Sequence, residues 1–183
     1  GGHPLIFIVG CGRSGTTLLL QWLAATGYFG YPSNLLSRFY AAPYLGVRIQ
    51  QLLTDPRYSF NDELTELRGV LGFESRLGKT KGPLAPNEFW YFWRRFIDFP
   101  EIHPVSEAAL AAADSALLRA ELVAMMRAFD RPLAMKALIM NWNLGYLADL
   151  LDRAIFLFIN RDPVLNAQSL LKARRDYFGT DAA

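Results

Sequence analysis

An apolar run followed at once by a glycine loop and a helical segment constrains the fold of this chain more than any other feature. Residues 5–9 read Leu-Ile-Phe-Ile-Val, a run rich in β-branched and aromatic side chains. Such a run suits a strand buried on both faces of a parallel sheet. The loop GCGRSGTT follows, and residues 16–25 favour a helix that ends near Gly27. This unit predicts an α/β fold with the loop at the carboxyl end of a strand.

Later segments repeat the alternation of strand and helix. Residues 133–138 and 154–159 are candidate strands, and we expect a helix between them over 144–153. A further helix is predicted from Asp162-Pro163, an N-cap followed by proline, to about Arg175. The alternation predicts a three-layer fold, in which a mainly parallel sheet is flanked by helices and its strands are joined by right-handed crossovers. Ligands of such sheets bind at the carboxyl ends of the strands.

Length and composition bound the domain organisation. The chain has 183 residues, of which 52% are hydrophobic, so we expect a single domain over residues 1–183 with one substantial core. Residues from about 30 to 130 are expected to form a mostly helical middle region, including an alanine-rich helix over 107–129 capped by Ser106. The small, polar ending predicts a natural chain that continues past residue 183, and therefore a domain that is incomplete at its C-terminus.

The charge balance and cysteine content exclude several classes of partner. Lys and Arg number 19 against 17 Asp and Glu, which leaves no global field to attract nucleic acid or a membrane surface. No apolar stretch reaches the roughly 20 residues that a membrane helix needs. Cys11 stands alone, which excludes an internal disulfide and a cysteine-based zinc site and favours a cytoplasmic location. We expect a local anion site, with no nucleic-acid partner and no membrane segment.

The glycine loop departs from the usual nucleotide loop, G-x-x-x-x-G-K-[ST], at its lysine. Gly10 and Gly15 hold the glycine positions, but Thr16 stands where the lysine would contact the β- and γ-phosphates. Backbone N–H groups and a helix N-terminus still favour an anion here. Arg13 adds a planar cation, and hydroxyls come from Ser14, Thr16 and Thr17. This set suits an anionic group held by hydroxyls and one arginine better than a triphosphate with a metal ion.

Taken with a second element, the loop resembles the sulfotransferase family that uses 3′-phosphoadenosine 5′-phosphosulfate (PAPS). Members carry a loop [KR]-x-G-T-[TS] for the 5′-phosphosulfate, which Arg13 to Thr17 match here. They also carry a strand, loop and helix with an arginine and, eight residues on, a serine for the 3′-phosphate. Arg161 and Ser169 stand at this spacing in INRDPVLNAQS. An arginine in the loop is similar to the tyrosylprotein branch and to several bacterial branches of the family.

The resemblance implies a P-loop-like sulfotransferase fold that transfers a sulfuryl group from PAPS to a hydroxyl acceptor and releases the desulfated nucleotide PAP. No metal is required by that chemistry. It implies that Arg161 and Ser169 bind the 3′-phosphate. The 5′-phosphate and sulfuryl oxygens would be bound by the loop, that is by Arg13, Ser14, Gly15, Thr16 and Thr17. A nucleotide with a phosphate at both ends of its ribose needs two separated anion sites, so physical chemistry agrees with this division. Arg13 would also stabilise charge in the transition state.

The catalytic base is open between a histidine and a glutamate. Many family members use a histidine, whereas the tyrosylprotein branch and some bacterial enzymes use a glutamate; His103 and Glu88 are the candidates here, with Glu74 a further loop carboxylate. Glu88 either lies beside an apolar acceptor pocket, which would raise its pKa, or is an ordinary glutamate at a helix start. Lys136 either resembles a lysine near the reacting group of some bacterial members or is an exposed lysine at a strand end.

The acceptor is expected to be a small molecule or a glycan that offers a hydroxyl, bound by the middle region. The run EFWYFWRRFIDF over 88–99 either packs a core or forms a wall of the acceptor pocket. Two other functions stay open on the sequence. The chain could be a degenerate P-loop kinase that uses ATP and Mg²⁺, or a non-catalytic nucleotide-binding module.

Overall fold

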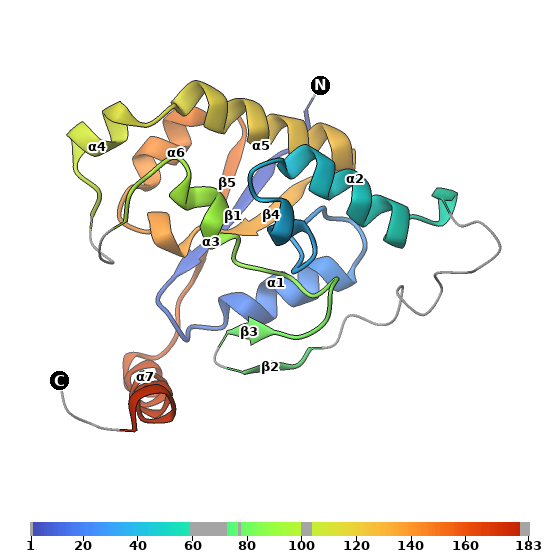
Figure 1. The fold of residues 1–183 in the computed structure, drawn as a ribbon. Coiled ribbons are helices and arrows are strands. Elements are labelled where there is room, and N and C mark those ends of the chain that lie inside the picture. Colours follow the sequence, from blue (N-terminus) through green and yellow to red (C-terminus); the bar gives the residue numbers. More distant parts are fainter. Residues whose placement is uncertain (1, 59–72, 77, 100–103, 180–183) are drawn as a thin grey trace.

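The fold is built on a parallel sheet of three strands in the order β4-β1-β5 (Figure 1). The computed structural model describes residues 2–58, 73–76, 78–99 and 104–179. The strands are β1 (Leu5–Gly10), β4 (Leu133–Lys136) and β5 (Ala154–Ile159). Each of the outer strands runs parallel to β1, in a register that sets Ile8 beside both Lys136 and Leu157. All three strands therefore present their carboxyl ends at one edge of the sheet.

Helices cover both faces of the sheet, because successive side chains of a strand point to opposite faces. Leu5, Phe7 and Val9 belong to a buried cluster that includes residues of the helices α3, α5 and α6. Ile6 and Ile8 belong to a second cluster, which they share with α1. The bounds of these helices are Thr16–Ala25 for α1, Trp90–Arg94 for α3, Ser115–Phe129 for α5 and Leu144–Leu150 for α6. The predicted three-layer α/β architecture is confirmed.

The middle region contributes short elements as well as helices. Helix α2 (Pro43–Thr54) packs against α5, with proline at its first position. The short 3₁₀ helices η1 (Leu36–Phe39) and η2 (Pro56–Tyr58) flank it. A small antiparallel hairpin of β2 (Ser75–Arg76) and β3 (Lys79–Thr80) follows, which the sequence analysis did not predict.

The alanine-rich segment forms two helices where one was predicted. Ser106 caps α4 (Glu107–Ala112) as expected, its side chain accepting a hydrogen bond from the Ala109 N–H at 3.2 Å. Asp114 then caps α5 by accepting from the Leu117 N–H at 2.9 Å. The single helix was a wrong prediction because an aspartate side chain competes with the helical backbone and starts a helix of its own.

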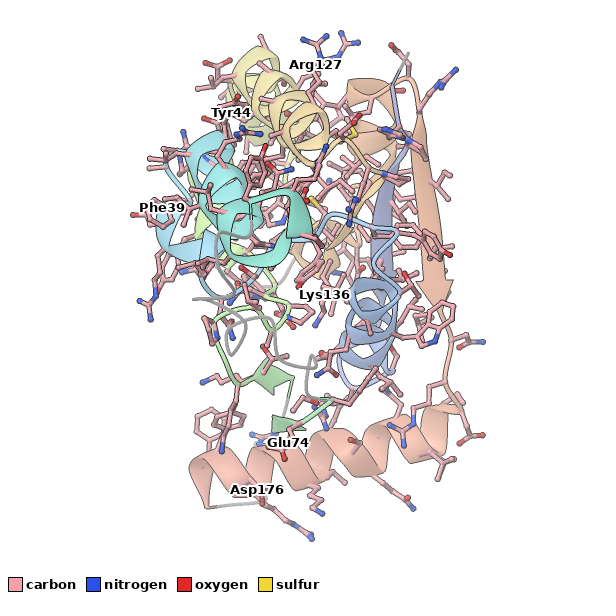
Figure 2. The ribbon with its side chains drawn as sticks, turned by 90° about the vertical axis from the view of Figure 1, so that its right-hand side faces the viewer. Phe39, Tyr44, Glu74, Arg127, Lys136 and Asp176 are labelled. Atoms are coloured by element: carbon pink, nitrogen blue, oxygen red, sulfur yellow. The ribbon has the colours of Figure 1, made fainter. Side chains whose placement is uncertain are left out.

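The last third of the chain follows the predicted order with shifted bounds. Strand β4 ends at Lys136, two residues earlier than predicted, and the 3₁₀ turn η4 (Leu138–Met140) follows it. Helix α7 (Pro163–Phe178) follows the predicted Asp162 cap, runs past Arg175 and is capped at its C-terminal end by Gly179, whose φ is 65°. It lies along one end of the molecule (Figure 2). In the described part of the chain, no helix combines the length and apolar character needed to span a membrane.

Candidate active site

The carboxyl ends of the three strands surround a cavity of about 380 Å³. Strand β1 supplies the glycine loop, β4 supplies Lys136, and Arg161 follows β5. Figure 2 shows Lys136 in the interior of the molecule, beside α1. The lining comes from five parts of the chain: Gly12, Arg13, Gly15, Thr16, Thr17, Leu18, Ser75, Gly78, Glu88, Trp90, Lys136, Leu138, Asn141 and Arg161. The cavity thus lies where ligands of parallel sheets bind.

Glycine is required at the first position of the loop. Gly10 has φ 137°, and a Cβ there would lie 2.6 Å from the carbonyl oxygen of Ile159 on β5. The side chain of Asn141 holds this strand end, donating through Nδ2 to the Gly10 oxygen at 2.7 Å and accepting from the Gly10 N–H at 3.2 Å. The sequence analysis missed Asn141, because an asparagine shortly after a predicted strand is not a distinctive signal.

The start of α1 offers donors to an anion. Gly15 is its N-cap, and no described side chain caps this end. The first N–H groups of a helix have no partner within it, and the helix dipole adds partial positive charge. Ser14 donates its N–H to the Cys11 oxygen at 3.2 Å, while its buried hydroxyl has no hydrogen-bond partner among the residues the structure describes. Both features suit an anionic ligand.

Three residues predicted to bind the nucleotide meet beside the loop. Arg13 donates from Nε to the Ser169 hydroxyl at 3.2 Å, and Arg161 donates from its guanidinium to the Arg13 carbonyl oxygen at 2.8 Å. Asn166 on α7 donates to the Gly12 oxygen at 2.9 Å. The first half of α7 is therefore fastened to the loop by side chains from the far end of the sequence.

A buried lysine forms the floor of the cavity. Lys136 is only 4% exposed, so the interpretation as an exposed strand-end residue is wrong. It donates from Nζ to the Thr17 hydroxyl at 3.0 Å and forms an ion pair with Glu88 Oε1. Burial lowers the pKa of Lys136, and the attraction of Glu88 opposes this only in part. The other carboxylate oxygen of Glu88 accepts from the indole N–H of Trp90.

The structure does not place the other base candidates in the cavity lining that it describes. Glu74 is exposed and is not among the described residues that line the cavity, and His103 lies outside the described residues. Gly78, from the unpredicted hairpin, approaches the centre of the site. A Cβ added to it would lie 3.7 Å from the Thr17 hydroxyl and 3.8 Å from Glu88 Oε1. Within the described residues, no group of three or more His, Cys, Asp or Glu side chains could hold a metal ion.

The aromatic side chains of residues 88–99 are divided between the core and a second cleft. Phe89, Phe92 and Trp93 are at most 1% exposed and belong to the core, as the packing interpretation predicted. Trp90 and Tyr91 instead line a second cleft of about 770 Å³. The two cavities share Gly78, Glu88 and Trp90 in their walls, so Glu88 stands where they meet.

The sheet, the glycine loop and the clustered basic and hydroxyl side chains define an α/β protein with an anion-binding site at its strand ends. The sequence model of the sulfotransferase family matches residues 4–181, so the chain belongs to the sulfotransferase family. No curated protein and no solved structure matches it. The family match confirms the predicted family and fold class, and it supports the transfer of a sulfuryl group as the general activity.

Proposed function

We propose that the protein transfers a sulfuryl group from PAPS to a hydroxyl acceptor and releases PAP. The proposal is carried by the contacts of Arg13 with Ser169 and Arg161, beside a helix N-terminus that no described side chain caps. A nucleotide with a phosphate at both ends of its ribose needs two separated anion sites. The helix start and these side chains supply both on one edge of the sheet.

The 5′-phosphosulfate is assigned to the loop. The N–H groups of Gly15, Thr16 and Thr17 belong to the start of α1, and the Ser14 hydroxyl, which has no partner among the described residues, is a further donor. The cavity lined by Gly15, Thr16 and Thr17 has room for the phosphosulfate next to Lys136. Arg13 lies at the rim, where its guanidinium can reach an equatorial oxygen of the transferring group.

The 3′-phosphate is assigned to Arg161 and Ser169. The Ser169 hydroxyl accepts a hydrogen bond from Arg13, so its own proton is available to a phosphate oxygen. Arg161 uses one guanidinium nitrogen to hold the Arg13 carbonyl and has further donors for the same phosphate. Binding of the 3′-phosphate would in this way also fix the loop that holds the other end of the nucleotide.

Glu88 is the proposed base and Lys136 the proposed cation at the reacting centre. The acceptor oxygen attacks sulfur, the bond between sulfur and the 5′-phosphate oxygen of PAP breaks, and the acceptor proton passes to Glu88. Both oxygens of Glu88 accept hydrogen bonds from N–H donors, an arrangement that suits an ionised carboxylate. Lys136 and Thr17, which are hydrogen-bonded to each other, are assigned to the departing oxygen, on which negative charge develops.

Ligand-dependent stability tests the proposal against its two rivals. At about 100 times its Kd, PAP is expected to stabilise the protein by about 2.7 kcal/mol and to raise Tm by about 5–10 °C, more than Mg·ATP does. Radiolabelled PAPS is expected to yield PAP and a sulfated acceptor. Stronger stabilisation by Mg·ATP would favour a kinase and overturn the proposal. Binding of PAP without transfer across a broad acceptor panel would indicate a non-catalytic module.

A further inference from the structure

The second cleft has an unbalanced positive charge. Of the described residues that line it, Arg38 and Lys79 are cationic and Glu88 alone is anionic. Glu88 is already neutralised by the buried Lys136. A cleft that joins the reacting centre therefore presents two positive charges without a compensating carboxylate in its described lining.

Several neutral polar side chains of this cleft already form hydrogen bonds within the protein. Asn34 donates to the Thr80 hydroxyl at 3.2 Å and to the Gly82 oxygen at 2.8 Å, and its own oxygen accepts from Asn87 at 2.8 Å. Ser37 donates to the Asn34 carbonyl at 2.7 Å. These bonds hold the chain around residue 34 against the segment 80–87, and they leave few uncharged hydrogen-bonding groups for a ligand.

The guanidinium of Arg38, by contrast, is available to bind a ligand. Arg38 lies on η1 and is exposed, and its side chain takes part in no hydrogen bond, ion pair or ring contact with another described residue. Lys79 is held over the ring of Tyr177 at 5.6 Å, which leaves its ammonium donors available. Beside them, Tyr40 and Tyr91 form a tilted pair with ring centroids 5.5 Å apart and expose 37% and 65% of their surface.

We propose that the acceptor is an anionic hydroxyl compound, whose carboxylate, sulfate or phosphate group is bound by Arg38 while its flat face packs on the Tyr40–Tyr91 pair. The inference rests on the proposed function and names the substrate class of the same site. The donor nucleotide carries several negative charges and would repel an anionic acceptor. The charges of Arg38 and Lys79 offset that repulsion on the acceptor side.

Matched acceptor pairs test the inference in the full chain. The aromatic pair is para-hydroxyphenylacetate and its methyl ester, and the glycan pair is para-nitrophenyl glucuronide and para-nitrophenyl glucoside; only the first member of each pair is anionic at neutral pH. In at least one pair, kcat/KM is expected to be about tenfold or more higher for the anionic member, mainly through KM, as one charge-assisted hydrogen bond gives. The pair that shows the larger difference identifies the source of the anion.

Arg38→Gln is expected to remove this preference and leave the neutral members unchanged. Arg127→Gln is the matched control, because Arg127 is also exposed but lies on α5, far from Lys136 (Figure 2). Equal kcat/KM within both pairs, or a preference that survives Arg38→Gln, would overturn the inference. If neither pair is sulfated, binding of the four compounds to the protein–PAP complex is measured instead. Tighter binding of the anionic members would support the inference, and equal binding within both pairs would overturn it. Failure to bind PAP at all would instead overturn the proposed function, and the inference with it.

Discussion

Lys136 Nζ lies 3.0 Å from the hydroxyl oxygen of Thr17, although the two residues are 119 positions apart. The sheet produces this contact, because β4 runs parallel to β1 in a register that sets Lys136 beside Ile8, just before the loop. The loop carries Thr16 where nucleotide loops carry lysine. A lysine from the neighbouring strand therefore supplies a cation to the first turn of α1, at the cost of burying it.

Lys136→Met is expected to lower kcat by about 100-fold or more, because it removes the buried cation to which the proposal assigns stabilisation of the departing oxygen. The Kd for PAP should change much less. Lys136→Arg should not restore kcat, since the side chain is 4% exposed and a planar guanidinium needs a different set of acceptors. Steady-state kinetics and calorimetric titration with PAP measure both effects, and thermal melts show whether each variant folds. An unchanged kcat in folded Lys136→Met would contradict the assignment.

Glu88→Gln is expected to lower kcat by about 100-fold to 10,000-fold while PAP binding is retained, because the amide cannot take the acceptor proton but keeps the shape of the side chain. Glu74→Gln is the matched control, as Glu74 is exposed and outside the described lining of the cavity. Its kcat should equal that of the wild type. A loss of PAP binding equal to the loss of kcat in Glu88→Gln would show that Glu88 acts in nucleotide binding instead.

Arg161→Ala is expected to weaken the binding of PAP by about 10-fold to 100-fold and the binding of adenosine 5′-phosphate only slightly. The reason is that the two ligands differ only in the 3′-phosphate, to which Arg161 is assigned. Titration of both nucleotides measures the difference, and Arg127→Ala on α5 serves as the control for loss of a surface arginine. Equal losses for the two nucleotides would show that Arg161 acts only by holding the Arg13 carbonyl, the contact seen at 2.8 Å.

The parts of the fold governed by nearby residues could be predicted from the sequence. The unit of β1, loop and α1 and the Asp162 cap of α7 depend on glycines, caps and apolar runs that act within a few residues. The break at Asp114 was local too, but its signal lay inside a strongly helical segment. Local rules therefore describe where elements start better than they describe where one element divides.

The centre of the site depended on relationships that local patterns do not contain. Lys136 could be placed at a strand end, but its burial and its pairing with Glu88 follow from the path of the middle region. The same is true of Asn141, which clamps Gly10, and of Gly78 on the small hairpin. Each contact joins segments whose distance in space is set by tertiary packing. The motif residues were found by their spacing, whereas their supporting residues required the fold.

The buried Tyr31 makes the free energy of unfolding depend on pH in the alkaline range. It is 7% exposed, its hydroxyl donates to the Leu84 oxygen at 3.0 Å, and burial raises the pKa of Tyr31 from 10.0 to about 12. Between these values the unfolded chain loses this proton while the folded chain keeps it, so the free energy of unfolding falls as pH rises. The contribution lost over this range is about 2–3 kcal/mol.

Tyr31→Phe is expected to remove that dependence. The variant should be about 1 kcal/mol less stable than the wild type below pH 10, through loss of the hydrogen bond, and the difference should shrink or reverse as pH approaches 12. Urea unfolding at a series of pH values measures it. Tyr28→Phe is the control, since Tyr28 is 76% exposed and its profile should run parallel to the wild type. Parallel profiles for Tyr31→Phe and the wild type would instead mean that the Tyr31 hydroxyl ionises in the folded protein as readily as in the unfolded chain.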